Sequence, residues 1–290
     1  MKPPPFSYHD PRSVDDAVSL LSTLENTKVL AGGQSLMPML NMRYVMPDHI
    51  VDLNKIENLS YIKKETDALE IGAMTRQREL EFSDIVKENC PIMHEALQWV
   101  GHRQTRNRGT LGGSLAHLDP AAEMPAVCAI SDAVVRVKGP NGEREIPFAE
   151  FPAGYMTPSV EMDEIVTSVR VPCWQKGHGF AFVEFARRHG DFAIVSSGAL
   201  LELDAEGRIV RSAITVGGVG AAPMRITEVE EAISGQIGSE DVFKEACEVC
   251  RGIEAMGDVY ASTEYRQHLA AVMSRRALVK AYDRALGGDN

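Results

Sequence analysis

The feature that most constrains this chain is a glycine-rich stretch, residues 106–117, which contains the adjacent pair Gly112 and Gly113. Adjacent glycines let the backbone adopt positive φ and approach a ligand closely, because no Cβ stands in the way. Consecutive free N–H groups in such a loop form a concavity suited to an anion, most often a phosphate. A second stretch of the same character lies far upstream at residues 31–36. We therefore expect the two loops to close on one ligand that bears a diphosphate.

Each glycine pair is a weak signal by itself, because many such pairs merely turn the chain. Neither loop matches the GxGxxG dinucleotide fingerprint or the GxxxxGK[ST] phosphate loop. A Rossmann or P-loop nucleotide site is therefore disfavoured. The hydroxyl groups of Ser35, Thr110 and Ser114 beside the glycines make the two loops more informative together than apart.

Length and charge limit the classes of protein to consider. A chain of 290 residues can bury a large core and suggests two domains, or one domain with a clear subdivision. The net charge of −11 and the lack of a basic stripe argue against a broad nucleic-acid surface.

The first residues contain three prolines and no apolar run, so we expect neither a signal peptide nor an anchor. No segment approaches the length of apolar residues needed to span a bilayer.

The five cysteines are widely scattered, and an odd, sparse set does not indicate a disulfide framework. We expect reduced thiols and a cytoplasmic setting. Cys247 and Cys250 have CxxC spacing, but they lie in a segment that we predict to be helical, with no second ligand pair nearby. Two thiols on a helix face are the favoured interpretation over a metal or redox site.

The N-terminal half alternates strand and helix patterns around the two loops. Ser13 is expected to cap a helix, and the strand at residues 27–31 runs directly into the first glycine turn. A short helix over residues 35–43 begins at that turn, where its dipole would favour a phosphate. Further strands are predicted at 50–53, 68–73, 133–139, 144–146 and 164–171, and further helices at 83–88, 91–99 and 123–130.

A shift in composition at residues 173–179 marks a natural boundary. Three strand-like runs follow it, at 179–186, 193–203 and 209–216, and then helical patterns at 227–234, 239–251 and 265–286. A meander of strands followed by helices is typical of an α+β arrangement. We therefore predict an α+β chain whose C-terminal part contains a three-stranded antiparallel sheet with helices.

Asp119 and Glu123 lie four residues apart after the second loop. One interpretation is a carboxylate pair for acid–base catalysis. The other, which we favour, is a helix start with Asp119 as N-cap and Pro120 at the first helical position. In that case Glu123 is free to accept a hydrogen bond from a ribose hydroxyl, as acids do in many dinucleotide sites.

Other chemistry is scarce in the sequence. The eight histidines show no HxxxH or HExxH spacing, so a metal site is not expected. No GxSxG elbow or partnered Ser/His/Asp set is present. Arg103, Arg106 and Arg108 are either a solvated basic face or, because they adjoin the glycine loop, contacts for a phosphate or for an acidic surface of a partner.

The two loops in this order resemble the FAD-binding medium subunits of the molybdenum hydroxylase (xanthine dehydrogenase/CO dehydrogenase) family. The family has an AGGxS loop followed by a T-[IL]-GG-[SN] loop, which stand here at residues 31–35 and 110–114. Further matching pieces are Pro38, Arg43, residues 51–53, residues 71–73, His117, Asp119, Pro120, Glu123 and residues 187–193. The resemblance covers nearly the whole chain.

The resemblance implies a two-subdomain FAD-binding domain of the vanillyl-alcohol-oxidase (PCMH) type over residues 1–176. Its subdomains would span about 1–57 and 58–176, and a C-terminal domain of the CO dehydrogenase flavoprotein kind would span 177–290. It also implies the cofactor-binding residues. These are Ala31, Gly32, Gly33, Gln34, Ser35, Leu36, Thr110, Leu111, Gly112, Gly113, Ser114, His117, Asp119, Glu123, Val166 and Phe192.

Within that set, the loops would hold the diphosphate of FAD and Glu123 its adenosine ribose. Phe192 stands where the family often has a tyrosine beside the flavin ring, so a hydroxyl is missing there. Gln34 stands where some relatives have histidine. Covalent attachment of FAD is not expected, nor are catalytic or metal-ligating residues in this chain.

By resemblance, the chain is an electron-transfer subunit that takes electrons from the 2Fe-2S clusters of a small subunit and passes them to an external acceptor. Hydroxylation would occur in a large subunit that holds the molybdopterin cofactor, within an (αβγ)2 heterohexamer. Residues 102–108 look most like members that act on N-heteroaromatic substrates such as quinoline. The alternatives are a self-sufficient flavin oxidoreductase and a flavin-free interaction module in which both loops are mere turns.

Overall fold

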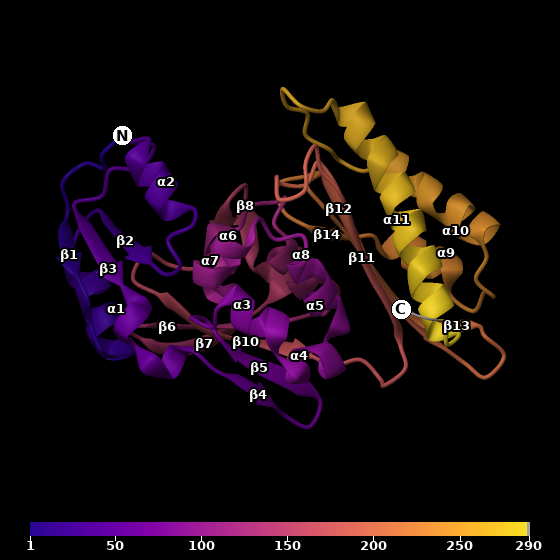
Figure 1. Cartoon of the computed structure of the whole chain (residues 1–290), viewed down its shortest axis with the longest axis horizontal. Coiled ribbons are helices and arrows are strands. Elements are labelled where there is room, and N and C mark those ends of the chain that lie inside the picture. The colour runs from indigo at the N-terminus through magenta and orange to yellow at the C-terminus, as the bar shows by residue number, and fades with distance from the viewer. Residues whose placement is uncertain (289–290) are drawn as a thin grey trace.

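The first glycine loop follows the edge strand of a small parallel sheet. The computed structural model describes residues 1–288, and Figure 1 shows three units in chain order. In the first unit, β3 (His49–Asp52) lies between β1 (Ser7–His9) and β2 (Thr27–Leu30), all parallel. Helix α1 (Val14–Thr23) begins at Ser13, whose hydroxyl accepts a hydrogen bond from the N–H of Asp16, as predicted. Helix α2 (Leu36–Asn41) follows β2 directly after the loop.

The second unit is an antiparallel sheet covered by helices. Its strand order is β4-β5-β10-β6-β7, and all neighbouring pairs are antiparallel. The strands are β4 (Ile62–Lys64), β5 (Ala68–Gly72), β6 (Val134–Gly139), β7 (Gly142–Pro147) and β10 (Ile165–Pro172), with a small pair β8 (Pro152–Gly154) and β9 (Thr157–Pro158) beside them. The predicted hairpin between β6 and β7 is present, with Gly142 at φ +113° in its turn.

Six helices belong to this unit. They are α3 (Gln77–Phe82), α4 (Asp84–Asn89), α5 (Pro91–Leu97), α6 (Arg103–Arg108), α7 (Leu111–His117) and α8 (Glu123–Ile130). The stretch at residues 106–117, expected to be a loop, is therefore the end of one helix and the whole of the next. Its paired glycines, Gly112 and Gly113, lie in the first turn of α7, because Thr110 caps that helix.

The third unit is an antiparallel sheet with helices on its outer face (Figure 1). It contains β11 (Gly179–Phe185), β12 (Val195–Leu203) and β13 (Ile209–Gly217), close to the three predicted strands. A fourth strand, β14 (Met224–Arg225), pairs with β13, so the prediction of three strands was one short. Two residues are too few for a hydrophobic period to show.

The helices of the third unit are α9 (Thr227–Ile233), α10 (Glu240–Ala246) and α11 (Thr263–Ala285). The predicted helix at 239–251 is only partly correct, because α10 ends at Ala246 and a 3-10 segment continues from Cys247 to Gly252. Ser239 caps α10 and Ser262 caps α11 through their hydroxyl groups.

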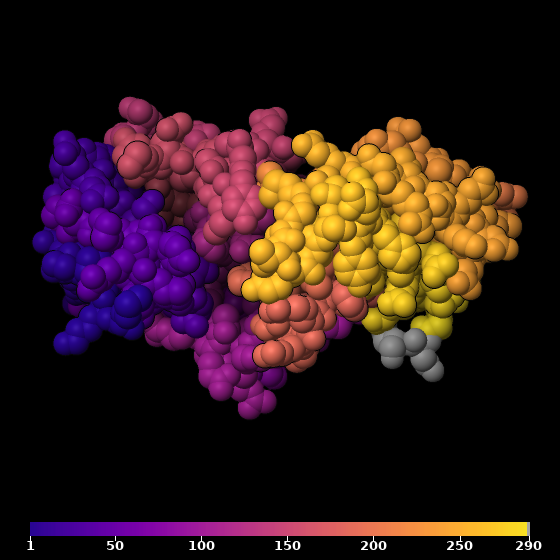
Figure 2. Space-filling model, turned by 90° about the horizontal axis from the view of Figure 1, so that it is seen from above, coloured from indigo at the N-terminus to yellow at the C-terminus, as the bar shows by residue number. Residues whose placement is uncertain are grey.

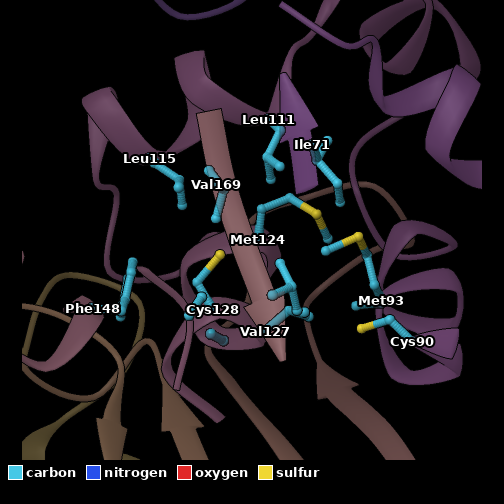
Figure 3. Packing of buried hydrophobic residues seen from close by; sticks show 14 of the residues in the cluster. Ile71, Cys90, Met93, Leu111, Leu115, Met124, Val127, Cys128, Phe148 and Val169 are labelled. Carbon is cyan, nitrogen blue, oxygen red and sulfur yellow. The ribbon is translucent and has the colours of Figure 1, made fainter. Parts of the chain in front are cut away.

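The second and third units share one apolar core. Figure 3 shows Met124 of α8 between Leu111 of α7 and Met93 of α5, with Val127 and Cys128 on the next turn. Phe182 and Leu200 from the third sheet belong to the same buried cluster. Helix α5 contacts β11, and helix α8 contacts β12 and β13. Both helices thus lie between two sheets. Burial of such side chains stabilises each by about 1.5–3 kcal/mol.

Candidate functional site

The two glycine loops touch each other through their backbones. A Cβ at Gly32 would lie 2.3 Å from the carbonyl oxygen of Arg108 and 2.8 Å from the Cα of Gly109. Gly33 has φ +73°, in the left-handed region that side chains with a Cβ seldom adopt. Both glycines of the first loop are therefore required by geometry, one by the close approach and the other by its backbone angle.

The first loop leaves its amide groups available. It follows β2 at the strand's carboxyl end, and among residues 1–288 no hydrogen bond uses the N–H of Gly33, Gln34 or Ser35. Residues 31–36 border a cavity, so these donors lie beside a space large enough for a ligand. An array of adjacent free amides is the arrangement that accommodates an anion.

The second loop behaves differently from the expectation. The N–H of Leu111 donates to Thr75 O (3.1 Å), that of Gly112 to Ala73 O (2.9 Å), and that of Gly113 to the Thr110 hydroxyl (3.1 Å). The expected free amides are therefore already used, because the chain leaving β5 presents its carbonyl groups to the start of α7. Gly112 is needed for this contact, since a Cβ there would lie 2.5 Å from that of Ala73.

A cavity of about 660 Å³ opens between the loops, within the usual range for small-molecule and cofactor sites. Figure 2 shows the surface hollowed between the indigo N-terminal unit and the rest of the chain. The lining of the cavity includes the following residues from the set expected to bind the cofactor: Ala31, Gly32, Gly33, Gln34, Ser35, Leu36, Thr110, Gly112, Gly113, Ser114, His117, Asp119, Glu123, Val166 and Phe192. Leu111 is the exception, because its side chain is fully buried in the core (Figure 3).

Glu123 is the most unusual ionisable group on this cavity. It is the first residue of α8 and is buried, yet within residues 1–288 no other residue donates a hydrogen bond to its carboxyl group. Burial raises the pKa of Glu123 to about 7, and the nearby Asp119 carboxylate acts in the same direction. A buried carboxyl that faces a cavity without a protein partner is suited to accept hydrogen bonds from ligand hydroxyl groups.

Asp119 is not the N-cap of the following helix, contrary to the prediction. Its Oδ1 accepts a hydrogen bond from the N–H of Ala121 at 2.9 Å, which makes a tight turn of residues 119–122. Helix α8 begins three residues later than Pro120, with Ala122 in the capping position. The side chain of Asp119 is therefore held by its own backbone, a known competitor of helix initiation.

His117 and the three arginines, Arg103, Arg106 and Arg108, lie in different environments. Burial lowers the pKa of His117, which ends α7 at the cavity wall. Arg106 does not reach the cavity, because its guanidinium pairs with Glu81 at 2.9 Å in the interior and donates to Val100 O. Arg103 and Arg108 are exposed. The sequence alone did not indicate Glu81 as the partner that removes Arg106 from the site.

The C-terminal unit contributes the opposite wall through residues 190–192. Gly190 has φ +88°, and a Cβ there would lie 2.4 Å from the His102 ring. Phe192 lines the cavity with 64% of its surface exposed. Arg266 of α11 supports this loop by donating to Ile194 O at 2.6 Å.

Several lining residues were not anticipated, among them Lys28, Gln77, Glu164 and Asp191. Gln77 begins α3, shortly after the end of β5. A polar residue at that place was the one signal in the sequence that could have indicated it as a lining residue. Its N–H donates to Gly109 O at 2.8 Å, so it also fixes the approach to the second loop.

Metal chemistry finds no support within residues 1–288, where no group of three or more His, Cys, Asp or Glu side chains is placed to hold an ion. Cys247 and Cys250 are buried, and desolvation raises the pKa values of their thiols to about 12 and 11. In the same part of the chain, no helix combines the length and apolar character needed to cross a membrane.

The cavity, the glycine loops and the fold together define a class of flavoprotein. The family model for the FAD-binding domain in molybdopterin dehydrogenase matches residues 4–174, and that for the CO dehydrogenase flavoprotein C-terminal domain matches residues 180–281. The chain therefore belongs to the family of FAD-binding medium subunits of molybdopterin-dependent dehydrogenases, as the resemblance implied. The free amides, the cavity volume and the buried Glu123 carboxyl on the cavity wall are compatible with FAD.

Individual relatives cover the whole chain. It is 40% identical to the 6-hydroxypseudooxynicotine dehydrogenase complex subunit alpha of Paenarthrobacter nicotinovorans, over 98% of this chain and 97% of that one. Among solved structures, CO dehydrogenase from Hydrogenophaga pseudoflava has a TM-score of 0.95 at 34% identity, covering 98% of this chain and 99% of that one. Quinoline 2-oxidoreductase from Pseudomonas putida 86 has the same TM-score at 33% identity, covering 99% and 100%.

Proposed function

We propose that this chain is the electron-transfer subunit of a molybdenum-containing dehydrogenase. It would hold FAD, receive electrons from 2Fe-2S clusters of a small subunit and pass them to an external acceptor. A large subunit would hold the molybdopterin cofactor and perform the substrate chemistry, in an (αβγ)2 assembly in the cytoplasm. The observation that supports this best is the cavity bounded by both glycine loops in a member of this family.

In this proposal the free N–H groups of Gly33, Gln34 and Ser35 donate to the diphosphate. Thr110 and Gly113 face it from the start of α7, and Glu123 accepts from hydroxyl groups of the adenosine ribose. Phe192 and Val166 provide apolar surface for the flavin ring, because both line the same cavity. FAD would supply the capacity to accept and release electrons, and the protein would supply the binding geometry.

The substrate of the complex is proposed to be decided elsewhere. The fold matches equally well a protein named for CO and one named for quinoline, both with a TM-score of 0.95. A chain whose fold is the same for a diatomic gas and a bicyclic aromatic does not itself discriminate between those molecules. We therefore expect the isolated chain to bind FAD without oxidising an organic substrate.

The test is reconstitution of the purified chain with FAD, followed by assay with and without the partner subunits. We expect one non-covalent FAD per chain, released on denaturation, and no turnover of N-heteroaromatic substrates by the chain alone. Addition of the iron-sulfur and molybdopterin subunits should produce substrate-dependent bleaching of the flavin. Turnover by the isolated chain would instead support a self-sufficient oxidoreductase.

A further inference from the structure

Two polar side chains, Asn54 and Arg76, connect the two glycine loops by hydrogen bonds. Asn54, which follows β3, donates from Nδ2 to the carbonyl oxygen of Ala31 at 2.9 Å. Arg76, which follows β5, donates from one guanidinium nitrogen to Asn54 Oδ1 and from another to the carbonyl oxygen of Arg108. A continuous chain of hydrogen bonds thus runs from the first loop, through Asn54 and Arg76, to Arg108 in the second loop.

Both members of this bridge are held firmly in place. Asp52 accepts from the backbone N–H of Asn54 at 2.9 Å and from the hydroxyl group of Tyr8 at 2.6 Å. The backbone of Arg76 forms an isolated β-bridge with Thr110, and its N–H donates to the Glu79 carboxylate at 2.9 Å. Because Asp52 ends β3 and Arg76 precedes α3, the bridge connects the first unit to the second.

The direct hydrogen-bond partners of the Arg76 guanidinium are uncharged. Its guanidinium is half-buried and donates to an amide oxygen and a carbonyl oxygen, both of which are neutral. Among residues 1–288, Arg76 forms no ion pair, whereas the nearby Arg106 is paired with Glu81. Burial and the nearby Arg108 charge lower the pKa of Arg76, and the carboxylates of Glu79 and Asp52 oppose this without forming a direct ion pair with it.

A guanidinium without a direct ion pair is therefore fixed beside the contact of the two loops, in a chain whose net charge is −11. Charges in a partly buried setting interact more strongly than charges in bulk water, because the effective dielectric is lower. A guanidinium also presents its donors in a rigid planar fork, so one side chain can fix two acceptors at a set separation.

We infer that Arg76 and Asn54 are positioning residues for the cofactor, which set the spacing of the two loops and supply the counter-charge of the bound diphosphate without touching it. This inference rests on the proposed function, since it requires FAD in the cavity. Arg76 differs from the loop residues in acting through backbone carbonyl groups. We therefore expect a change at Arg76 to alter the binding of the diphosphate end of FAD and to leave the environment of the flavin ring unchanged.

The experiment compares FAD affinity and its salt dependence in the full-length chain for Arg76→Gln, Arg76→Lys and Asn54→Ala. Arg251→Gln is the matched control, because Arg251 is an exposed arginine paired with Glu248 in the C-terminal unit. We expect Arg76→Gln to weaken FAD binding by about 10- to 100-fold, the value of a charge-assisted hydrogen bond. Its dissociation constant should also depend less on salt, while the control matches the wild-type chain.

Arg76→Lys separates the two roles, because it keeps the charge and loses the fork. It should bind FAD with intermediate affinity and keep the wild-type salt dependence. Asn54→Ala should weaken binding and keep that dependence as well. If Arg76→Gln fails to fold, the lysine variant still tests the fork. Wild-type affinity and salt dependence in every folded variant would overturn the inference, whereas a wild-type chain that binds no FAD would overturn the proposed function.

Discussion

Gly32 lies against the carbonyl oxygen of Arg108, so close that a single methyl group at residue 32 would stand 2.3 Å from that oxygen. These residues are far apart in the sequence and belong to different units, yet their backbones meet at the cavity. The spacing of the two loops thus depends on the absence of one side chain.

Gly32→Ala should therefore both destabilise the chain and weaken FAD binding. Neither contact atom belongs to a flexible side chain, so the loops must separate, at a cost of about 1–3 kcal/mol for overpacking. Denaturant unfolding and FAD titration measure the two effects. Gly252→Ala is the control, because a Cβ there meets nothing within 4 Å and φ is not positive. Unchanged stability and affinity in Gly32→Ala would show that the loops do not meet as described.

Glu123 should make the stability of the FAD-free chain depend on pH. Burial raises its pKa from an ordinary 4.5 to about 7, so the folded state holds the proton more tightly than the unfolded state. The stability contributed by this proton is complete below about pH 4.5 and is lost as pH rises through 7, by up to about 3 kcal/mol. Glu123→Gln should thus match the wild-type chain at pH 5 and exceed its stability at pH 8.

The measurement is the free energy of unfolding at several pH values, with Glu206→Gln in the exposed turn between β12 and β13 as control. The same Glu123→Gln variant should bind FAD more weakly, because an amide replaces the acceptor of the ribose hydroxyl groups. Parallel pH profiles for wild type and Glu123→Gln would contradict the assignment of Glu123 as the titrating group.

Glu184 in β11 provides a second, separable pH effect. Its carboxyl group is buried, one oxygen has no hydrogen-bond partner, and desolvation together with the nearby Glu123 charge raises its pKa to about 9. By the same sign, its contribution to stability is complete below about pH 4.5 and is lost progressively as pH rises to 9. Glu184→Gln should flatten the loss of stability between pH 5 and 9, and an unaltered loss would refute this.

The cysteines should differ sharply in reactivity. Cys90, Cys128, Cys247 and Cys250 are buried, and desolvation raises the pKa values of their thiols, whereas Cys173 is half-buried. Because the thiolate is the reactive species, a disulfide reagent should label Cys173 rapidly and the other four only after denaturation. Fast labelling of Cys247 or Cys250 in the folded chain would contradict their role as core residues.

Much of the site could be predicted because glycine spacing reflects strict geometric needs. Gly32, Gly33 and Gly112 each stand where a Cβ would collide or the backbone angle demands it. The use of the Leu111 and Gly112 amides could not be predicted, because their acceptors, Thr75 and Ala73, lie after β5 and far away in sequence. Tertiary pairing, which no local pattern records, decides which donors remain free.

The same limit explains the errors in the fold. Strands β1 and β14 have three and two residues, too short for an alternating pattern to be visible. Asp119 has the composition of a helix cap, but its carboxylate closes a turn on Ala121 instead. Glu184 was not singled out in the sequence. It lies on the same face of β11 as Phe180 and Phe182, and the packing of the third sheet against α5 and α8 buries it.

The central claim is that both glycine loops hold one FAD in the cavity between them. Calorimetric titration of the FAD-free chain with FAD tests it most directly, with the wild type beside Gly33→Val and Gly113→Val. Residue 33 has φ +73°, and a Cβ at residue 113 would lie 2.7 Å from the Thr110 hydroxyl oxygen. We predict one FAD per wild-type chain and at least about 10-fold weaker binding in either variant, the effect of roughly 1.4 kcal/mol. Wild-type affinity in both folded variants would contradict the account.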